Sequence, residues 1–475
     1  MKSVAVPAAV LFTLIVAALT WAMWPSALER GQQAYARGDY AAAATTLRPI
    51  AEKGDVKAQV MLGRMAAAGQ GAPANPVAAV EWFLKAAAQH DGGAALELGD
   101  RYTRGDGVPQ SDDEALLWYR RAAAAANTTG LQRLTDLAKQ GSSRAKLQLA
   151  TLYVNGEGVP QNKSEAARWF REAAGRGITE AAQSLMGLAS ENVAEASYQL
   201  GQLYERGQGL PPNLPKAVTA YTRAANQLHL AAQVRLAELY EQGKGIRRDE
   251  AAAAEWYGKA AHQGHGESQL RYGLILLRGR GVPVNKPEAA RWIGEAASNG
   301  IPGAIAPLRE LGAAGIAGAQ YKLASLYAEG KGVPQDGKQA VDWLRKAAEQ
   351  GLAVAQFDLA YAYGAGQGTP VDNAAAAHWY GEATVQGFAT AVPKLAQLAN
   401  RGEPVAQFYL GRYLVNGGKL PSRPADETDD LIHAVMRWFR ALRSDPVADG
   451  MALLRKAADA GNADAQEALR KLPAR

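Results

Sequence analysis

Apolar residues recur along the chain at the spacing of one helix face. A leucine follows an alanine by four positions, and further apolar side chains stand two positions before and four after it, as at Tyr198, Leu200 and Tyr204. Residues at these spacings lie on one side of an α-helix, so each copy predicts a helix with one buried face. The leucine position is held by Leu62, Leu98, Leu149, Leu200, Leu236, Tyr272, Leu323, Leu359 and Leu410.

Only two steps separate these positions, 36 and 51 residues, which indicates a repeat array. A Gly-x-Gly pair follows eight of the helices, and a second helix comes after it with an aromatic residue near its middle. Isolated units of this kind cannot bury their apolar faces, so their stability must come from stacking. The aromatic positions are Trp82, Trp118, Trp169, Tyr221, Trp256, Trp292, Trp343 and Trp379.

The Gly-x-Gly loops, such as "GDGVPQ" from Gly105, suggest phosphate binding when taken alone. A phosphate loop needs a following Lys-Ser/Thr, and a dinucleotide fold needs a preceding strand, and none of the eight loops has either. Instead, a residue that caps helix N-termini follows each loop, and the first glycine fits a left-handed helix end. We therefore expect structural turns. The capping residues are Asn75, Ser111, Asn162, Asn213, Asp249, Asn285, Asp336 and Asp372.

Each 51-residue step contains 15 additional residues with a pair of leucines three apart, for example Leu134 and Leu137. Each addition predicts one short extra helix without a Gly-x-Gly turn. Since an odd helix disturbs a stack of pairs, we expect breaks near residues 127–142, 178–193, 301–316 and 388–403.

The two ends of the array depart from the repeat. Residues 26–56 predict an opening helical hairpin, residues 57–418 the repeat solenoid, and residues 419–475 an irregular last repeat with a capping helix. In that last part "HAVMRWFRAL" repeats the second-helix theme around Trp438, and the stretch from Met451 resembles a further second helix followed by a polar cap.

The N-terminal segment from Val4 to Trp24 carries no charge. At about 1.5 Å per residue a helix of this length spans about 30 Å, the thickness of a bilayer core. A cleaved signal peptide is the alternative, although Trp21 and Trp24 crowd its cleavage site. We expect residues 1–25 to form a transmembrane anchor or uncleaved signal sequence that crosses the bacterial inner membrane once through residues 4–24, with residues 26–475 in the periplasm.

The helix pairs resemble the Sel1-like repeat family, relatives of tetratricopeptide repeats. Close matches begin at Ala95, "ALELGDRYTRGDGVPQSDDEALLWYRRAAAAA", and at Ala319, "AQYKLASLYAEGKGVPQDGKQAVDWLRKAAEQG". The resemblance implies an all-α, right-handed α/α solenoid that serves as a binding scaffold or adaptor, without shared catalytic residues. Scaffolds for exopolysaccharide synthesis and export are similar in length and layout.

Composition removes several other classes of function. The chain has no cysteine, so disulfides, thiolate metal sites and cysteine nucleophiles are excluded. The net charge of +6 comes without a dense run of basic residues, which argues against nucleic acid as a partner. His262 and His265 are the one close histidine pair, but they fall at a turn and lack a zinc-protease motif. We expect no catalytic residue, no metal site and no cofactor.

Candidate binding residues lie on the variable face of the first helices. Arg235, Arg271 and Lys322 stand immediately before the leucine position and would form a basic stripe in a regular stack. Such a stripe suits an anionic polymer or an acidic partner; a solvated face is the alternative. Tyr409 holds the same position in the last repeat, where we also expect exposure. Leu274 and Tyr361 are apolar where the other repeats are polar, and either bind a protein partner or pack on an additional helix.

Three functions follow from this pattern. The first is a membrane-anchored periplasmic scaffold for other envelope proteins in exopolysaccharide biosynthesis and secretion, with a polysaccharide synthase or an outer-membrane export pore as candidate partners. The second is a regulator that binds a membrane sensor. The third is direct binding of an acidic polysaccharide; an enzyme ranks last.

Overall fold

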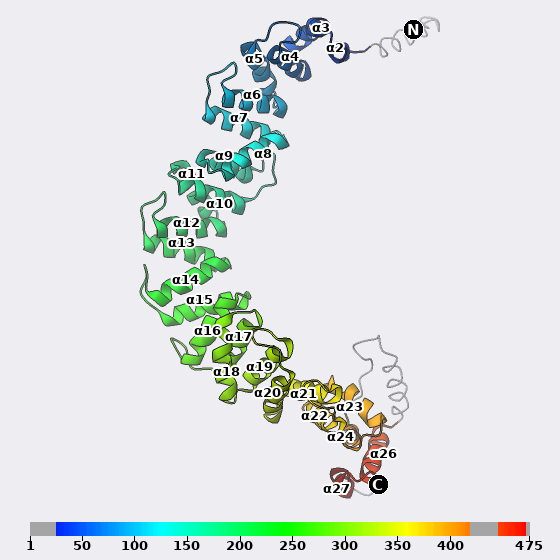
Figure 1. Ribbon diagram of the computed structural model, residues 1–475. Helices are drawn as coiled ribbons and strands as arrows, with labels where there is room; N and C mark the ends of the chain where they lie inside the picture. The colour runs from blue at the N-terminus through cyan, green and yellow to red at the C-terminus, as the bar shows by residue number, and fades with distance from the viewer. Residues whose placement is uncertain (1–24, 419–444, 472–475) are drawn as a thin grey trace, which may run out of the picture. The chain divides into compact units, whose positions relative to one another are not determined.

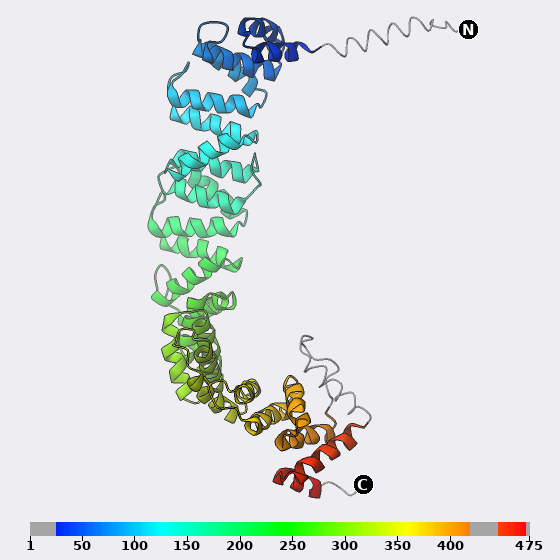
Figure 2. The same ribbon diagram turned by 45° about the vertical axis from the view of Figure 1, so that its right-hand side comes forward.

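The computed structural model describes residues 25–418 and 445–471, which form 25 α-helices and one short 3-10 helix. These residues contain no strand, so the expected all-α solenoid is confirmed for them. They divide into two compact units, one of residues 25–236 with Lys244–Ile246, the other of Ala237–Gly243 with residues 247–418 and 445–471. Within each unit, helices that follow one another in sequence lie side by side in both views (Figure 1, Figure 2).

We call the helices that carry the leucine position A helices and their partners B helices. The A helices are α4 (Val56–Ala68), α6 (Gly92–Arg104), α9 (Ser143–Asn155), α12 (Ala194–Arg206), α14 (Leu230–Gln242), α16 (Gly266–Arg278), α19 (Ala317–Glu329), α21 (Ala353–Ala365) and α24 (Pro404–Val415). The B helices are α5 (Pro76–Ala87), α7 (Asp112–Ala124), α10 (Lys163–Ala174), α13 (Leu214–Asn226), α15 (Glu250–His262), α17 (Lys286–Ser298), α20 (Gly337–Glu349), α22 (Asn373–Val385) and α26 (Pro446–Asp459).

The eight Gly-x-Gly loops are structural turns, as predicted. All eight expected N-cap side chains accept a hydrogen bond from the backbone amide three residues later, which satisfies one free donor at the start of each B helix. The first glycine of each pair ends its A helix with a positive φ, for example +72° at Gly105. No phosphate ligand is needed to explain these loops.

The second glycine of the pair has a role that the sequence did not show. At Gly158 and Gly209 an added Cβ would overlap the backbone carbonyl oxygen of Ala123 and of Ala174 respectively. Both carbonyls belong to the B helix of the preceding repeat. The loop therefore packs directly on the neighbouring repeat, and only glycine allows this approach.

Large side chains of the B helices cover glycines of the A helices. In the first two repeats the residue after the central tryptophan does so: Phe83 covers Gly63, and Tyr119 covers Gly99. Phe83 is fully buried, whereas Trp82 is half-buried and carries the ammonium of Lys85 over its ring at 4.3 Å.

Buried glutamines join consecutive repeats. Gln320 of α19 donates from Nε2 to the carbonyl oxygen of Gly312 at 2.9 Å and accepts from Gln350 Nε2 at 2.6 Å. The carbonyl lies at the end of the helix before α19, where backbone acceptors lack helical partners. The same side-chain-to-carbonyl bond, eight residues back, is made by Gln59, Gln233, Gln269, Gln356 and Gln407.

The four additional helices are present where the leucine pairs predicted them. None of the four interrupts the stack: each packs against the helices before and after it. The boundary between the two compact units lies elsewhere, so the expected breaks do not separate compact units. The additional helices are α8 (Thr128–Lys139), α11 (Thr179–Ser190), α18 (Ile305–Ala313) with the 3-10 helix η1 (Pro302–Ala304), and α23 (Ala391–Asn400).

The ends of the array close the stack. Helices α2 (Ala27–Ala36) and α3 (Tyr40–Glu52) precede the first A helix, and α27 (Ala463–Lys471) follows α26. Helix α26 packs on α24 as the B helix of the last repeat, with Gly450 against Gly411. The stretch around Trp438, expected to repeat the second-helix theme, lies outside the described residues.

Helices α2–α24, α26 and α27 include none that is long and apolar enough to cross a membrane. The expected anchor, residues 4–24, falls outside the residues that the structure describes.

Candidate interaction surface

The three basic residues expected to form a stripe each contact a carboxylate. Arg235 forms an ion pair with Glu205 of the preceding A helix, with Nε to Oε2 at 3.1 Å. Burial opposes ionisation of Glu205, but Arg235 and Tyr221 outweigh it and lower the pKa of that carboxyl. Arg235 thus helps to hold two repeats together, which is the role of a stacking residue rather than of a free cation.

The other two cations are also paired. Lys322 Nζ lies 3.3 Å from Glu295 Oε1 on α17, and Arg271 Nε lies 3.4 Å from Glu267 Oε1 on its own helix. Both pairs are partly exposed, so each contributes little to stability. A polymer that bound these cations would have to compete with the carboxylates already beside them.

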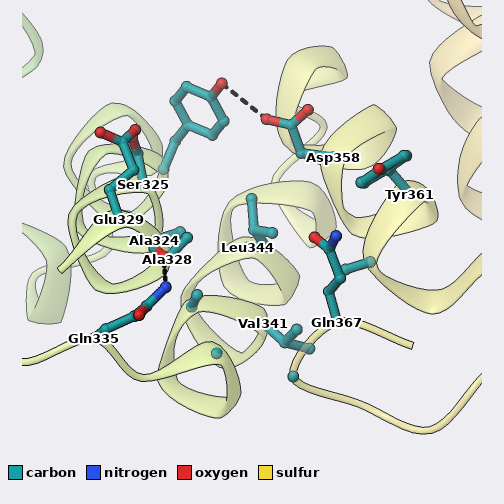
Figure 3. Close-up of a pocket in the computed structure, with 15 residues that line it drawn as sticks. Ala324, Ser325, Ala328, Glu329, Gln335, Val341, Leu344, Asp358, Tyr361 and Gln367 are labelled. Carbon is teal, nitrogen blue, oxygen red and sulfur yellow. Dashed lines mark hydrogen bonds between the residues drawn. The ribbon is translucent and has the colours of Figure 1, made fainter. Parts of the chain in front are cut away.

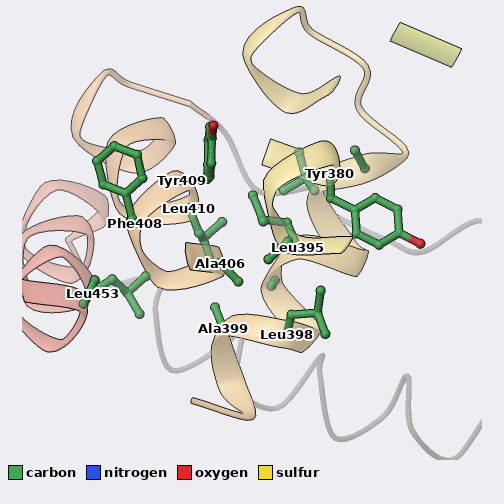
Figure 4. Packing of buried hydrophobic residues seen from close by; sticks show 14 of the residues in the cluster. Tyr380, Leu395, Leu398, Ala399, Ala406, Phe408, Tyr409, Leu410 and Leu453 are labelled. Carbon is green, nitrogen blue, oxygen red and sulfur yellow. The ribbon is translucent and has the colours of Figure 1, made fainter. Parts of the chain in front are cut away.

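The expected exposure of Tyr409 is wrong, since only 9% of this residue is exposed. It lies over Gly381 of α22, and its hydroxyl donates to Glu382 Oε1 at 2.6 Å. Figure 4 shows Tyr409 in the cluster formed by α22, α23, α24 and α26. Leu274 is half-buried against the cluster around α17 and α18, which matches the packing alternative.

Tyr361 is the one candidate aromatic that remains open to solvent, with 46% of the residue exposed. It stands at the rim of a hollow of about 830 Å³ between α19, α20 and α21. Figure 3 shows its ring and the carboxylate of Asp358 on one side, with Ser325 and Glu329 across from them. We call this hollow, together with the smaller one described below, the Tyr361 groove.

The floor of the groove is apolar. Leu344 and Val341 of α20 supply it, and the amide of Gln367 points in from the loop after α21 (Figure 3). The backbone is close here because Gly337 and Gly368 touch, so that a side chain on Gly368 would overlap the carbonyl of Gly337. The groove therefore has a floor built by the stacking of two repeats.

The charged side chains that line the large hollow, Glu329 and Asp358, are both acidic. Asp358 accepts a hydrogen bond from the Tyr321 hydroxyl at 2.9 Å, and burial raises the pKa of its carboxyl. Glu329 pairs with Lys331 at 2.6 Å, which lowers its pKa. No cation of the described chain neutralises Asp358 within ion-pair distance.

A second hollow of about 150 Å³ adjoins the first, and Tyr361 lines both. Its charged lining residues are basic: Lys394 and Arg401, both from the region of the additional helix α23. The Tyr361 groove thus has an acidic part, an aromatic residue at the junction, and a basic part.

The His262 and His265 pair has structural roles. His262 Nδ1 bonds to the carbonyl oxygen of Gly258, and its ring meets Trp292 edge-on at 4.8 Å. His265 caps α16, because its Nδ1 accepts from the backbone amide of Ser268. The described residues contain no group of three or more metal-binding side chains.

Of the sequence candidates, only Tyr361 lies in the groove. Sequence reasoning did not single out Asp358, although it stands at the same variable position as Arg235. It gave no signal for Lys394 and Arg401, because the face that an additional helix presents depends on how that helix packs.

This arrangement of paired helices joined by glycine turns defines an α-helical repeat protein. The Sel1 repeat model matches ten segments that cover more than half of the chain, so the chain belongs to the Sel1 repeat family, whose members are generally non-catalytic protein-interaction scaffolds. The segments are residues 56–91, 93–127, 143–178, 194–227, 230–265, 266–301, 317–352, 353–387, 404–427 and 443–462.

The chain is also similar to solved structures. A Sel1 repeat protein from Oxalobacter formigenes is 30% identical over 72% of this chain and 86% of its own, with a TM-score of 0.29. A protective antigen of uropathogenic Escherichia coli with the same repeat fold is 24% identical over 91% of this chain and 98% of its own, with a TM-score of 0.27. A search of curated proteins gives no match.

Proposed function

We propose that this chain is a non-enzymatic scaffold that holds other proteins at a bacterial envelope membrane, and that the Tyr361 groove is a docking site. The observation that carries the docking site is the exposed ring of Tyr361 over an apolar floor, at a position that is polar in most other repeats. An exposed aromatic beside a hollow of this size is typical of protein and ligand contact sites.

Residues 4–24 support the placement at a membrane because they are uncharged over the length of a bilayer core. With Lys2 before this segment, the orientation that we propose puts the repeats in the periplasm. Among envelope processes we place exopolysaccharide biosynthesis and secretion first, because family scaffolds for that process are similar in layout. The partner there would be a polysaccharide synthase or an export pore.

Direct binding of an acidic polysaccharide by Arg235, Arg271 and Lys322 has less support, because each of these cations already contacts a carboxylate. A regulator that docks on a membrane sensor would use the same groove. The regulator and the exopolysaccharide scaffold are therefore distinguished by the identity of the bound partner and not by the binding site.

The placement is tested by fusing a periplasm-dependent reporter enzyme to the C-terminus of the full-length chain in its own host. Activity of the reporter, and retention of the fusion in the membrane fraction after alkaline extraction, are the expected results. A reporter that is inactive in an intact, expressed fusion contradicts the periplasmic placement. Release into the soluble fraction contradicts the anchor.

The process is tested by deleting the gene and measuring secreted polysaccharide. We expect loss of secretion that is restored by the wild-type chain and not by a chain with Tyr361→Ala. Normal secretion in the deletion strain contradicts the exopolysaccharide role and leaves the docking site to be judged by its own test.

A further inference from the structure

The charges of the Tyr361 groove are separated along its length. The charged side chains that line its large hollow are the carboxylates of Asp358 and Glu329, of which Glu329 is already paired with Lys331, so Asp358 is the one left for a ligand. The small hollow is lined by Lys394 and Arg401 and, among the described residues, by no carboxylate. Tyr361 lines both hollows, so the change of sign occurs across a single aromatic ring. A ligand that matches this surface must carry opposite charges at its two ends.

Asp358 is the strongest reason to expect a cation from outside. A partly buried carboxylate is costly unless a positive charge or several hydrogen bonds compensate for its lost hydration. Here it receives one hydrogen bond, from Tyr321. At the same repeat position Arg235 and Lys322 have opposite charges beside them, so Asp358 differs from its counterparts.

The polar groups of the rim suit a polypeptide. The side chain of Gln367 points into the hollow in Figure 3 and has no hydrogen-bond partner among the described residues, so its amide can bond to a peptide backbone. Gln335 across the hollow is already used, donating to the Ala328 carbonyl at 2.9 Å. Leu344 and Val341 at the floor suit an apolar side chain rather than a sugar ring rich in hydroxyls.

Building on the proposed function, we propose that the Tyr361 groove binds a segment of a partner protein with a basic residue, one or more apolar residues and an acidic residue, in that order along the groove. The basic residue pairs with Asp358, the apolar residue lies on Leu344 against Tyr361, and the acidic residue meets Lys394 or Arg401. An acidic polysaccharide does not fit, because the larger hollow would repel it.

The direct test measures binding of short fluorescent peptides to the full-length protein by anisotropy. The first probe is a peptide that carries arginine at one end, leucine and phenylalanine at its centre, and aspartate at the other end. The second has the same residues in reverse order. The third has glutamine in place of both charged residues, and the fourth has serine in place of both central residues. We expect one of the two charged orders to bind about tenfold or more tightly than the glutamine and serine versions. Equal binding of all four, or none by any, overturns the proposal.

Variants assign the contacts. Tyr361→Ala and Asp358→Asn should each weaken the best peptide about tenfold or more, and the matched controls Val385→Ala and Glu349→Gln, which lie outside both hollows, should not. The Asp358→Lys variant should no longer bind the arginine peptide and should instead bind the same peptide with glutamate in place of arginine. This exchange of preference cannot come from a merely unfolded variant, and its failure in a folded protein overturns the Asp358 contact.

A second test uses the cell. A photoreactive benzoylphenylalanine replaces Tyr361 or, as the control, Val385 in the full-length chain, and the crosslinked partner peptide is sequenced. A segment with a basic residue beside an apolar one, captured only from position 361, supports the proposal. An acidic or uncharged segment, or a polysaccharide adduct, overturns it. Secretion that depends on the chain, while Tyr361→Ala changes neither secretion nor crosslinking at other sites, supports the scaffold function and contradicts docking at the Tyr361 groove.

Discussion

Leu228 occupies a backbone conformation that disfavours it, and replacing it should stabilise the protein. It lies in the turn between α13 and α14 with φ of +63°, where the equivalent turns hold Gly264 and Gly351 with φ of +85° and +83°. A left-handed conformation costs an L-residue about 1–2 kcal/mol. The greater freedom of glycine in the unfolded chain offsets about 0.5–1 kcal/mol of that.

The side chain of Leu228 contributes little to set against this strain, because 71% of the residue is exposed. We therefore expect Leu228→Gly to raise the local stability by about 0.5–1 kcal/mol. Repeat arrays need not unfold in one step, so hydrogen exchange of the α13 amides in the full-length protein is the measurement, with urea unfolding beside it.

Two variants isolate the backbone term. Leu228→Ala removes the side chain but keeps an L-residue at positive φ, so it should bring no gain. Gly264→Ala is the reverse change at an equivalent turn, where an added Cβ meets nothing within 4 Å, and it should cost about 1 kcal/mol. The reasoning is refuted if Leu228→Gly is no more stable than Leu228→Ala.

Three further predictions concern buried polar groups. Gln320→Ala should lower the free energy of unfolding in urea by about 1–3 kcal/mol, because it removes the two hydrogen bonds that this buried amide makes with the Gly312 carbonyl and with Gln350, whereas Gln367→Ala, the exposed control, should not. Ser197→Ala should leave stability unchanged or raise it, since the buried Ser197 Oγ has no hydrogen-bond partner among the described residues; a clear loss would contradict this. Burial opposes ionisation of Glu195, but hydrogen bonds from neighbours that include His229 lower the pKa of its carboxyl to about 2. The wild type should therefore lose more stability than Glu195→Gln as the pH falls from about 4.5 to about 2. Parallel profiles of stability against pH for the two proteins would refute this assignment.

The repeat frame could be predicted from the sequence because its determinants are local. A capping residue and the amide it bonds are three residues apart, and a left-handed glycine is fixed by the turn it ends. The additional helices were equally predictable, since Leu134 and Leu137 mark one helix face without reference to the rest of the chain.

The charges could not be assigned in the same way. Arg235 and Glu205 are 30 residues apart, and Lys322 and Glu295 are 27 apart. Whether two such residues meet depends on the offset between stacked helices, which the repeat spacing does not give. Tyr409 shows the same limit, because its position predicts exposure until helix α22 and its Gly381 are placed beneath it.

The Tyr361 groove lies where the residue before the leucine position no longer forms an ion pair with a neighbouring repeat of the described chain. The residue before the leucine position serves the stack at Arg235 and Lys322, which contact carboxylates of neighbouring repeats. At Asp358 the stack supplies a tyrosine hydroxyl instead of a cation, and three residues later Tyr361 replaces a polar residue with an exposed ring. Both changes are unfavourable for the chain alone, since one leaves a partly buried charge and the other exposes an apolar surface. A bound segment with a basic and an apolar side chain would correct both, which is why we locate the docking site here rather than along the basic residues.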